Sequence, residues 1–137
     1  MLVVREVLNP RDRKRFVLLP WKANRGDPNF VPPIVADEMK LCDVDAHPFW
    51  QDGATGRFFL AERDGEPVGR IAAIRNPRYE TFANEPAAFF GFYDCAETGR
   101  WGEETTRALV ERVRECVRGW SLPYFYGPAS PSSNYLY

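Results

Sequence analysis

The stretch RFFLAERDGEPVGRIAAIR at residues 57–75 decides how this chain folds. Two apolar, β-branched runs are joined by Asp64 and Gly65, a dipeptide that tolerates positive φ at both positions, so the pattern predicts a β-hairpin. Apolar residues occupy both faces of the second run: Val68, Ile71, Ala72 and Ile74. A strand of this kind lies centrally in a sheet, so we expect helices to cover both faces of that sheet.

A third strand is predicted in AAFFGFYD, at residues 87–94. Strict alternation divides its aromatic side chains between the two faces: Phe90 and Phe92 on one, Phe89 and Tyr93 on the other. Gly91 interrupts the run. A glycine inside a strand marks a bulge or the close approach of another group, although packing against a ring is the commoner cause.

Residues 100–119 predict a long amphipathic helix, because apolar side chains recur at three- and four-residue steps. The opposite face is charged, and Arg107 has an acidic residue four positions away on each side, Glu103 and Glu111. Ion pairs between such neighbours each contribute only about 0.2–0.5 kcal/mol. Gly119 is placed to end this helix.

A fourth buried strand is predicted after this helix, in LPYFYG at residues 122–127. The order strand, helix, strand implies a parallel pair with a right-handed crossover, whereas the hairpin is antiparallel. The predicted fold is therefore α/β (α+β), with a mixed, mostly antiparallel sheet flanked by helices.

The first part of the chain predicts a strand at residues 2–8 and a short helix that starts at Asn9 and Pro10 and runs through Phe16 and Leu19. Further elements are predicted along the chain: an extended connection at residues 20–33, which holds four prolines, a short helix at 34–41, irregular structure at 43–56, and a turn or short helix at 76–84.

Composition limits the classes of function. A chain of 137 residues fits one domain, residues 1–137. Its 18 basic and 19 acidic residues give a net charge of −1, which argues against a nucleic-acid-binding protein. The basic run RDRKR, residues 11–15, is interpreted as a solvated helix face rather than a phosphate-binding arm.

The chain shows neither the pattern of a signal peptide nor an apolar run long enough to cross a bilayer, so we expect a cytoplasmic protein with no membrane partner. Its three cysteines, odd in number and widely spaced, suit neither a disulfide framework nor a zinc site. The single histidine, His47, has no second ligand at metal-binding spacing, so we expect no metal. It is interpreted as a packed loop residue, with general base as the alternative.

Five segments together resemble the GNAT superfamily of acyl-CoA-dependent N-acyltransferases, and more narrowly a group of longer, poorly characterised bacterial proteins. The segments are RGDPNFVPP at 25–33, HPFW at 47–50, FFLAERDGEPVGRIAAI at 58–74, FFGFYDC at 89–95 and GPASPSSN at 127–134. The resemblance implies acetyl transfer from acetyl-CoA, or transfer from another acyl-CoA, to the amine of a small molecule or peptide.

The resemblance also implies where the cofactor binds. The pantetheine arm pairs with residues 90–95, and the pyrophosphate meets the helix start at residues 96–103, where unpaired N–H groups and a positive helix end bind anions. The implied cofactor-binding residues are Phe92, Tyr93, Asp94, Cys95, Gly99, Arg100, Gly102 and Asn134. Backbone amides near residues 93–95 are expected to polarise the thioester, and Glu62, Asp94 and His47 are the candidates for the catalytic base.

Two features depart from the GNAT pattern at the helix start. Trp101 stands where a tight phosphate-binding turn favours a small residue. Glu103 and Glu104 suit the helix macrodipole but oppose a bound pyrophosphate. An ordinary capped helix is therefore the alternative interpretation, and with it a catalytically degenerate binding module. Such a module would use aromatic side chains in the two irregular segments: Trp21, Phe30, Phe49 and Trp50.

The superfamily fold continues beyond the strand that we predict at residues 122–127, whereas this sequence stops at Tyr137. Tyr135 and Tyr137 are expected to fray rather than to protonate the leaving thiolate. An unpaired strand at residues 124–126 would expose backbone and aromatic surface. We therefore expect either that the chain lacks a C-terminal segment, through truncation or an interrupted reading frame, or that a second copy covers this strand in a homodimer.

Overall fold

The computed structural model describes residues 1–131 and contains one sheet with the strand order β1-β2-β3-β4-β5. The strands are β1 (Leu2–Glu6), β2 (Thr55–Arg63), β3 (Glu66–Arg75), β4 (Ala87–Cys95) and β5 (Tyr124–Tyr126). The first four pair in antiparallel fashion, while β4 and β5 are parallel. The predicted mixed, mostly antiparallel sheet is confirmed. So is the hairpin turn, because Asp64 and Gly65 both have positive φ, 53° and 85°.

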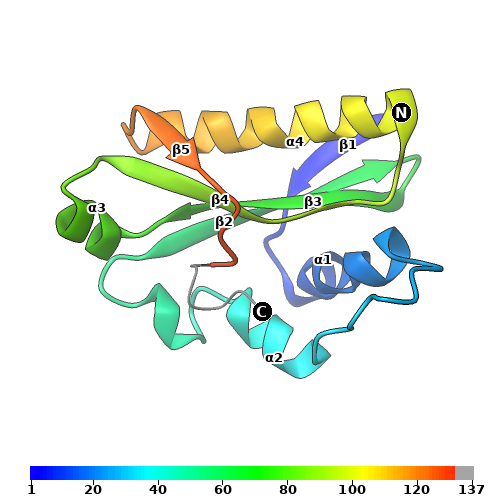
Figure 1. The fold of residues 1–137 in the computed structure, drawn as a ribbon, viewed down its shortest axis with the longest axis horizontal. Helices are drawn as coiled ribbons and strands as arrows, with labels where there is room; N and C mark the ends of the chain where they lie inside the picture. The colour runs from blue at the N-terminus through cyan, green and yellow to red at the C-terminus, as the bar shows by residue number, and fades with distance from the viewer. Residues whose placement is uncertain (132–137) are drawn as a thin grey trace.

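Helices cover the two faces of this sheet (Figure 1). The long helix α4 (Gly99–Gly119) lies over one face, and α1 (Pro10–Ala23) and α2 (Val35–Leu41) lie over the other. The short helix α3 (Pro77–Ala83) and a 3₁₀ turn at Pro48–Trp50 complete the described elements. The apolar character of both faces of β3 reflects this position between two helical layers.

Each helical layer has its own core. The core beneath α4 is built on Phe59, Ile71 and Leu109, all at most 1% exposed. The core beneath α1 and α2 is aromatic, and Phe16, Phe58 and Phe92 meet there in edge or tilted contacts with centroids 5.4–6.2 Å apart. These two cores fix the positions of the helices relative to the sheet.

Helix α1 begins as predicted but does not stop where we expected. The Asn9 side chain accepts a hydrogen bond from the Asp12 amide, and the helix then continues through Pro20 to Ala23. Pro20 has no N–H to donate to the carbonyl four residues earlier, that of Phe16. Arg70 of β3 replaces this donor, since its Nη1 lies 3.1 Å from the Phe16 oxygen. A side chain 54 residues away therefore satisfies the carbonyl that Pro20 leaves without a donor.

The basic run at residues 11–15 is only partly the solvated face that we predicted, because Asp12 is buried. Its carboxylate accepts hydrogen bonds from Arg5 and Arg15, at 3.0–3.2 Å. The same two guanidinium groups also bind Glu62, each at 2.5 Å. This four-residue ion-pair network joins α1 to β1 and β2.

A bulge in β4 changes which side chains share a face. Arg70 pairs with Asp94 and Ala72 pairs with Gly91, so two residues of β4, Phe92 and Tyr93, stand opposite Ile71 alone. Phe92 adopts the bulge conformation, with φ of 53°. It packs in the core beneath α1, whereas Phe90 packs beneath α4. The predicted placement of Phe90 and Phe92 on one face was therefore wrong, because strict alternation ends at the bulge.

Candidate functional site

Strands β4 and β5 stay paired over only part of their length. Their ladder has three residue pairs and ends at Phe89 and Tyr126. The following segment stays against β4 for a short distance, because Ala129 donates to the Phe90 carbonyl at 2.9 Å and Ser130 Oγ accepts from the Phe92 amide at 3.0 Å. These contacts end at Phe92, three residues before β4 itself ends.

Gly91 is required where this segment crosses β4. A Cβ added there would lie 1.5 Å from the Ala129 carbonyl oxygen, a separation that no side chain tolerates. Gly91 is therefore explained by the close approach of another backbone segment, and it lies directly before the bulge at Phe92.

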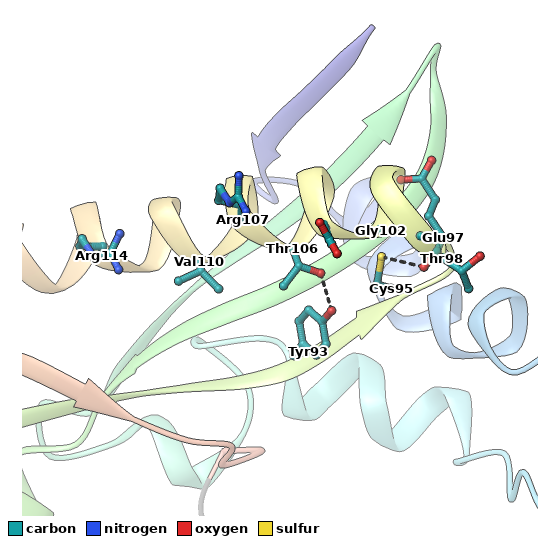
Figure 2. A pocket seen from close by; sticks show the side chains of 11 residues that line it. Tyr93, Cys95, Glu97, Thr98, Gly102, Thr106, Arg107, Val110 and Arg114 are labelled. Atoms are coloured by element: carbon teal, nitrogen blue, oxygen red, sulfur yellow. Dashed lines mark hydrogen bonds between the residues drawn. The ribbon is translucent and has the colours of Figure 1, made fainter.

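A groove of about 600 Å³ lies between the end of β4 and helix α4 (Figure 2). Tyr93 and Cys95 line it from β4, Glu97 and Thr98 line it from the connecting turn, and Gly99 lines it from the start of α4. Helix α4 contributes Gly102, Glu103, Thr106, Arg107, Val110 and Arg114. We call this hollow the β4–α4 groove.

The first turn of α4 forms one end of the β4–α4 groove. Thr98 is the N-cap residue, but its side chain makes no capping hydrogen bond. Gly99 starts the helix with φ of 62°, and a Cβ at Gly102 would lie 2.7 Å from the Glu97 carbonyl oxygen. This tight turn brings the first amides of a 21-residue helix to the groove. Such amides, together with the positive end of the helix dipole, attract anions.

Charges of both signs line the groove, but some of the acidic charge is already neutralised. Glu97 accepts hydrogen bonds from Arg63 at 2.7 Å and from Thr105 at 2.6 Å. Burial opposes ionisation of Glu97, yet these hydrogen bonds hold its pKa below the ordinary value. Glu103 is the remaining acidic residue on the lining, and it lies on the same helix as the cations Arg107 and Arg114.

Arg107 makes no ion pair within residues 1–131, although we expected pairs with Glu103 and Glu111. Glu111 binds Arg114 instead, at 2.6 Å. The guanidinium group of Arg107 is thus available to an anion in the β4–α4 groove. Sequence reasoning assigned Arg107 to a solvated charged face, because periodicity does not show that a groove runs along that face.

The hydroxyl groups of Tyr93 and Thr106 lie 2.6 Å apart and link β4 to α4 across the groove (Figure 2). Cys95 is half-buried, with Sγ 3.6 Å from the Glu97 carbonyl oxygen. The bulge at Phe92 turns both side chains toward α4. Without it, alternation would direct them to the opposite face.

The structure brings together four of the predicted cofactor-binding residues, Tyr93, Cys95, Gly99 and Gly102, on the groove lining. Arg100 lies beside the groove, on the outer surface of α4 with Glu104 and Ala108.

The other predicted cofactor-binding residues are placed differently. Phe92 is buried on the opposite face of the sheet, and its amide is already bonded to Ser130. Asp94 also points to that face. Asn134 lies outside the described residues, as do Tyr135 and Tyr137.

Two of the three candidate bases have their side chains engaged away from the groove. Glu62 is held by Arg5 and Arg15, and these hydrogen bonds lower its pKa despite burial. His47 starts the 3₁₀ turn at Pro48–Trp50, where its Nδ1 accepts a hydrogen bond from the Phe49 amide at 3.1 Å.

Asp94 is the candidate base that belongs to β4 itself. Its carboxylate is half-buried on the α1 side of the sheet, directly opposite Arg70 in the strand register. Asn24 Nδ2 lies 3.5 Å away, and the Cys95 amide donates to Oδ1 at 3.1 Å. Burial raises the pKa of Asp94, and the charge of Arg70 partly offsets the rise. A carboxylate with a raised pKa is suited to accept a proton near neutral pH.

Within residues 1–131 no cluster of three potential metal ligands is found. No helix in that part of the chain combines the length and the apolar character needed to span a bilayer.

Comparison with known sequences gives partial matches to two curated proteins, and no protein-family model matches. A 72-residue stretch, 53% of this chain, is 39% identical to the bacterial ceramide synthase of Caulobacter vibrioides and covers 18% of that protein. A 99-residue stretch, 69% of this chain, is 26% identical to Protein YghO of Escherichia coli and covers 24% of it. The matched stretches therefore span less than a quarter of either relative.

Solved structures with a similar fold include several acetyltransferases. A predicted acetyltransferase with acetyl-CoA from Clostridium acetobutylicum has a TM-score of 0.64 and 13% identity, over 93% of this chain and 81% of that one. The aminoglycoside acetyltransferase meta-AAC0020 from a soil metagenomic sample gives 0.63 and 15%, over 93% and 77%. A tandem GNAT protein from the clavulanic acid biosynthesis pathway gives 0.63 and 17%, over 88% and 34%.

Proposed function

From the premise that the chain has the GNAT acetyltransferase fold, we propose that it is an acyl-CoA-dependent N-acyltransferase. The observation that carries the proposal is the β4–α4 groove, which lies where β5 has left β4 and where a long helix begins. The activity consists of transferring an acyl group, acetyl in the simplest case, from the thioester of CoA to an amine.

The residues present fit an acyl-CoA. The first-turn amides of α4 and the unpaired Arg107 supply donors and positive charge for the pyrophosphate. The edge of β4 beyond Phe92, which β5 does not cover, is suited to a pantetheine arm. Glu103 is the one feature of the lining that opposes a bound anion.

The bound acyl-CoA supplies a thioester, and the chain's own residues supply orientation and proton transfer. We assign polarisation of the thioester carbonyl to backbone amides near residues 93–95 other than that of Cys95, which donates to Asp94 Oδ1. The amine nitrogen forms a bond to the acyl carbon, the carbon–sulfur bond breaks, and the sulfur leaves as CoA thiolate. We assign the proton lost by the amine to Asp94, the candidate base on β4 itself, whose carboxylate lies on the α1 side of the sheet. The amine must therefore reach the thioester from that side.

The partial likeness to a ceramide synthase supports the same chemistry. Ceramide is an N-acylated long-chain amino alcohol, so its synthesis forms the amide bond that we propose here. A lipid amine with a long-chain acyl-CoA is therefore a specific pair to test beside acetyl-CoA. Use of acyl-CoA also agrees with action in the cytoplasm.

The alternative, a catalytically degenerate binding module, has one specific observation in its favour, the carboxylate of Glu103 in the groove. The aromatic side chains that suggested it do not form an exposed surface. Phe49 and Trp50 are buried in the core, at 5% and 6% exposure. Trp21 and Phe30 are half-buried and pack edge to face, with centroids 5.9 Å apart.

Thermal unfolding with and without acetyl-CoA tests the proposal. A ligand that binds only the folded state stabilises it by about 2.7 kcal/mol at one hundred times its dissociation constant. We expect the melting temperature to rise with millimolar acetyl-CoA and to rise less with acetylated pantetheine, which lacks the pyrophosphate. A melting curve that neither acetyl-CoA nor a long-chain acyl-CoA displaces would contradict the proposal.

A further inference from the structure

Arg70 is a buried cation that the proposed reaction does not yet use. It is 8% exposed, and its guanidinium carbon lies 4.9 Å from the centre of the Phe16 ring and 5.9 Å from that of Phe92. Nη1 donates to the Phe16 carbonyl, whereas Nε has no hydrogen-bond partner in the described part of the chain. Burying a charge is costly when its donors are incompletely paired, so Arg70 requires a reason beyond one hydrogen bond.

The bulge in β4 places Asp94 on the face of the sheet that Arg70 occupies. Arg70 and Asp94 are direct partners in the β3–β4 register, so their side chains leave the sheet on the same face. If β4 alternated strictly after Gly91, Asp94 would face α4 and Tyr93 would face Arg70. The bulge therefore places Tyr93 on the groove side of β4 and Asp94 on the side that Arg70 occupies.

Arg70 is the charged group that faces Asp94 across the β3–β4 register, and its charge favours the ionised carboxylate. The other contributors are neutral: the Cys95 amide on β4 and the Asn24 side chain at the end of α1. Around Arg70 itself lie Asp94, Cys42 and, on α2, Glu38, whose own pKa is raised by burial. Burial thus raises the pKa of this half-buried carboxylate, and the charge of Arg70 on the same face of the sheet offsets part of the rise, together with the hydrogen bonds from the Cys95 amide and Asn24.

We propose that Arg70 is a positioning residue that keeps Asp94 ionised and so sets the pH range in which the acceptor amine loses its proton. This inference rests on the proposed N-acyl transfer. The acceptor's N–H bond breaks as its nitrogen binds the acyl carbon, and the proton passes to an Asp94 oxygen. The electron pair of the broken C–S bond leaves with the CoA sulfur.

One structural role of Arg70, the hydrogen bond to the Phe16 carbonyl, can be separated experimentally. Pro20→Ala restores the amide that an α-helix would direct at this carbonyl. In a Pro20→Ala background the helix no longer needs Arg70, so the fold of Arg70→Met is protected there. Any remaining effect of Arg70→Met then reports on Asp94.

The test is an NMR titration of the Asp94 carboxyl carbon in the full chain, with Asp94→Asn to assign the signal. We expect Arg70→Met in the Pro20→Ala background to raise the pKa of Asp94, because the cation that favours the carboxylate is lost. Arg70→Lys keeps the charge and should leave the titration near its original position. An unchanged titration in Arg70→Met would overturn the inference, whether or not the protein is active.

Acyl transfer is then measured against pH in the same variants. The acidic limb of the profile for Arg70→Met should move to higher pH with the Asp94 titration, while the melting shift caused by acetyl-CoA is retained. Asp94→Asn should lower the rate by about 10²–10⁴-fold. A profile that stays in place while the Asp94 titration moves would also overturn the inference. Loss of the acetyl-CoA melting shift in the unmutated chain would instead contradict the proposed function.

Discussion

At the scale of single residues, Cys95 reports on the β4–α4 groove. Its thiol is half-buried on the groove lining, whereas Cys42 and Cys116 are each 4% exposed. Burial raises the pKa of Cys42 to about 12 and also raises that of Cys116, so neither forms the reactive thiolate readily.

We expect iodoacetamide to alkylate Cys95 first, and acetyl-CoA to slow this reaction because a bound pantetheine arm would cover the thiol. Mass spectrometry of peptides gives the rate at each cysteine, with Cys42 and Cys116 as internal controls. Equal rates at Cys95 with and without saturating acetyl-CoA would argue that the cofactor binds elsewhere.

A second residue-scale prediction concerns Gly91, which has no room for a Cβ beside the Ala129 carbonyl. Gly91→Ala should push residues 127–131 off β4 and lower the free energy of unfolding by about 3 kcal/mol. Gly119→Ala is the matched control, because nothing lies within 4 Å of its added Cβ, and it should gain about 0.5–1 kcal/mol. Urea unfolding measures both. Equal stability of the two variants would contradict the crossing of β4.

At the scale of elements, helix α4 carries opposing charges along the groove. Arg107→Gln should weaken acetyl-CoA binding about tenfold, because a charge-assisted hydrogen bond to phosphate is lost. Glu103→Gln should strengthen binding about two- to fivefold, because it removes a repulsive carboxylate.

The matched controls for these two changes lie on the same helix but off the groove, Arg118→Gln and Glu115→Gln. Calorimetry at low and high salt should show that only the groove variants change the dissociation constant, and that the difference shrinks as salt screens the charges. If Arg118→Gln weakened binding as much as Arg107→Gln, the pyrophosphate would have been assigned to the wrong part of α4.

At the scale of the whole molecule, the network of Arg5, Asp12, Arg15 and Glu62 ties the N-terminal strand and helix to the sheet. Hydrogen bonds from Arg5 hold the pKa values of both carboxyl groups below their ordinary values of 3.8 and 4.5. A carboxyl group with a lowered folded-state pKa contributes stability above its ordinary pKa. That contribution is lost as the pH falls through the folded-state value.

The melting temperature should therefore fall as the pH drops below about 4.5, and Glu62→Gln should flatten this dependence. At pH 7 the same change should cost about 1–2 kcal/mol, between the values typical of exposed and buried pairs. Glu111→Gln, which breaks an exposed helical pair, should cost less than about 0.5 kcal/mol. A Glu62→Gln variant with the original acid dependence would show that the network does not govern acid unfolding.

Within the described chain, the two edges of the sheet are β1 and β5. Strand β5 exposes Tyr124 and Tyr126, at 41% and 44%. Unpaired backbone beside aromatic surface favours association with another segment or chain. The expected cover of this edge, by further sequence or a second copy, stays a prediction.

The sequence by itself determined the features that arise from local physics. Asp64-Gly65 specifies a tight turn, Asn9 with Pro10 starts a helix, and the apolar repeat of residues 100–119 forms one helical face. The order of elements then required a parallel β4–β5 pair, because a helix separates these strands. These features gave the GNAT fold and, by resemblance, part of the groove lining.

Only the tertiary structure decided how distant residues alter these local patterns. Pro20 does not end α1 because Arg70 supplies a donor from 54 residues away, and Asp12 is buried because Arg5 and Arg15 surround it. Asp94 and Tyr93 exchanged their expected faces because one bulge shifts the strand period by one residue. Periodicity describes neighbours along the chain, whereas burial, ion pairing and strand register depend on residues far apart in sequence, and those contacts determine where the site's side chains point.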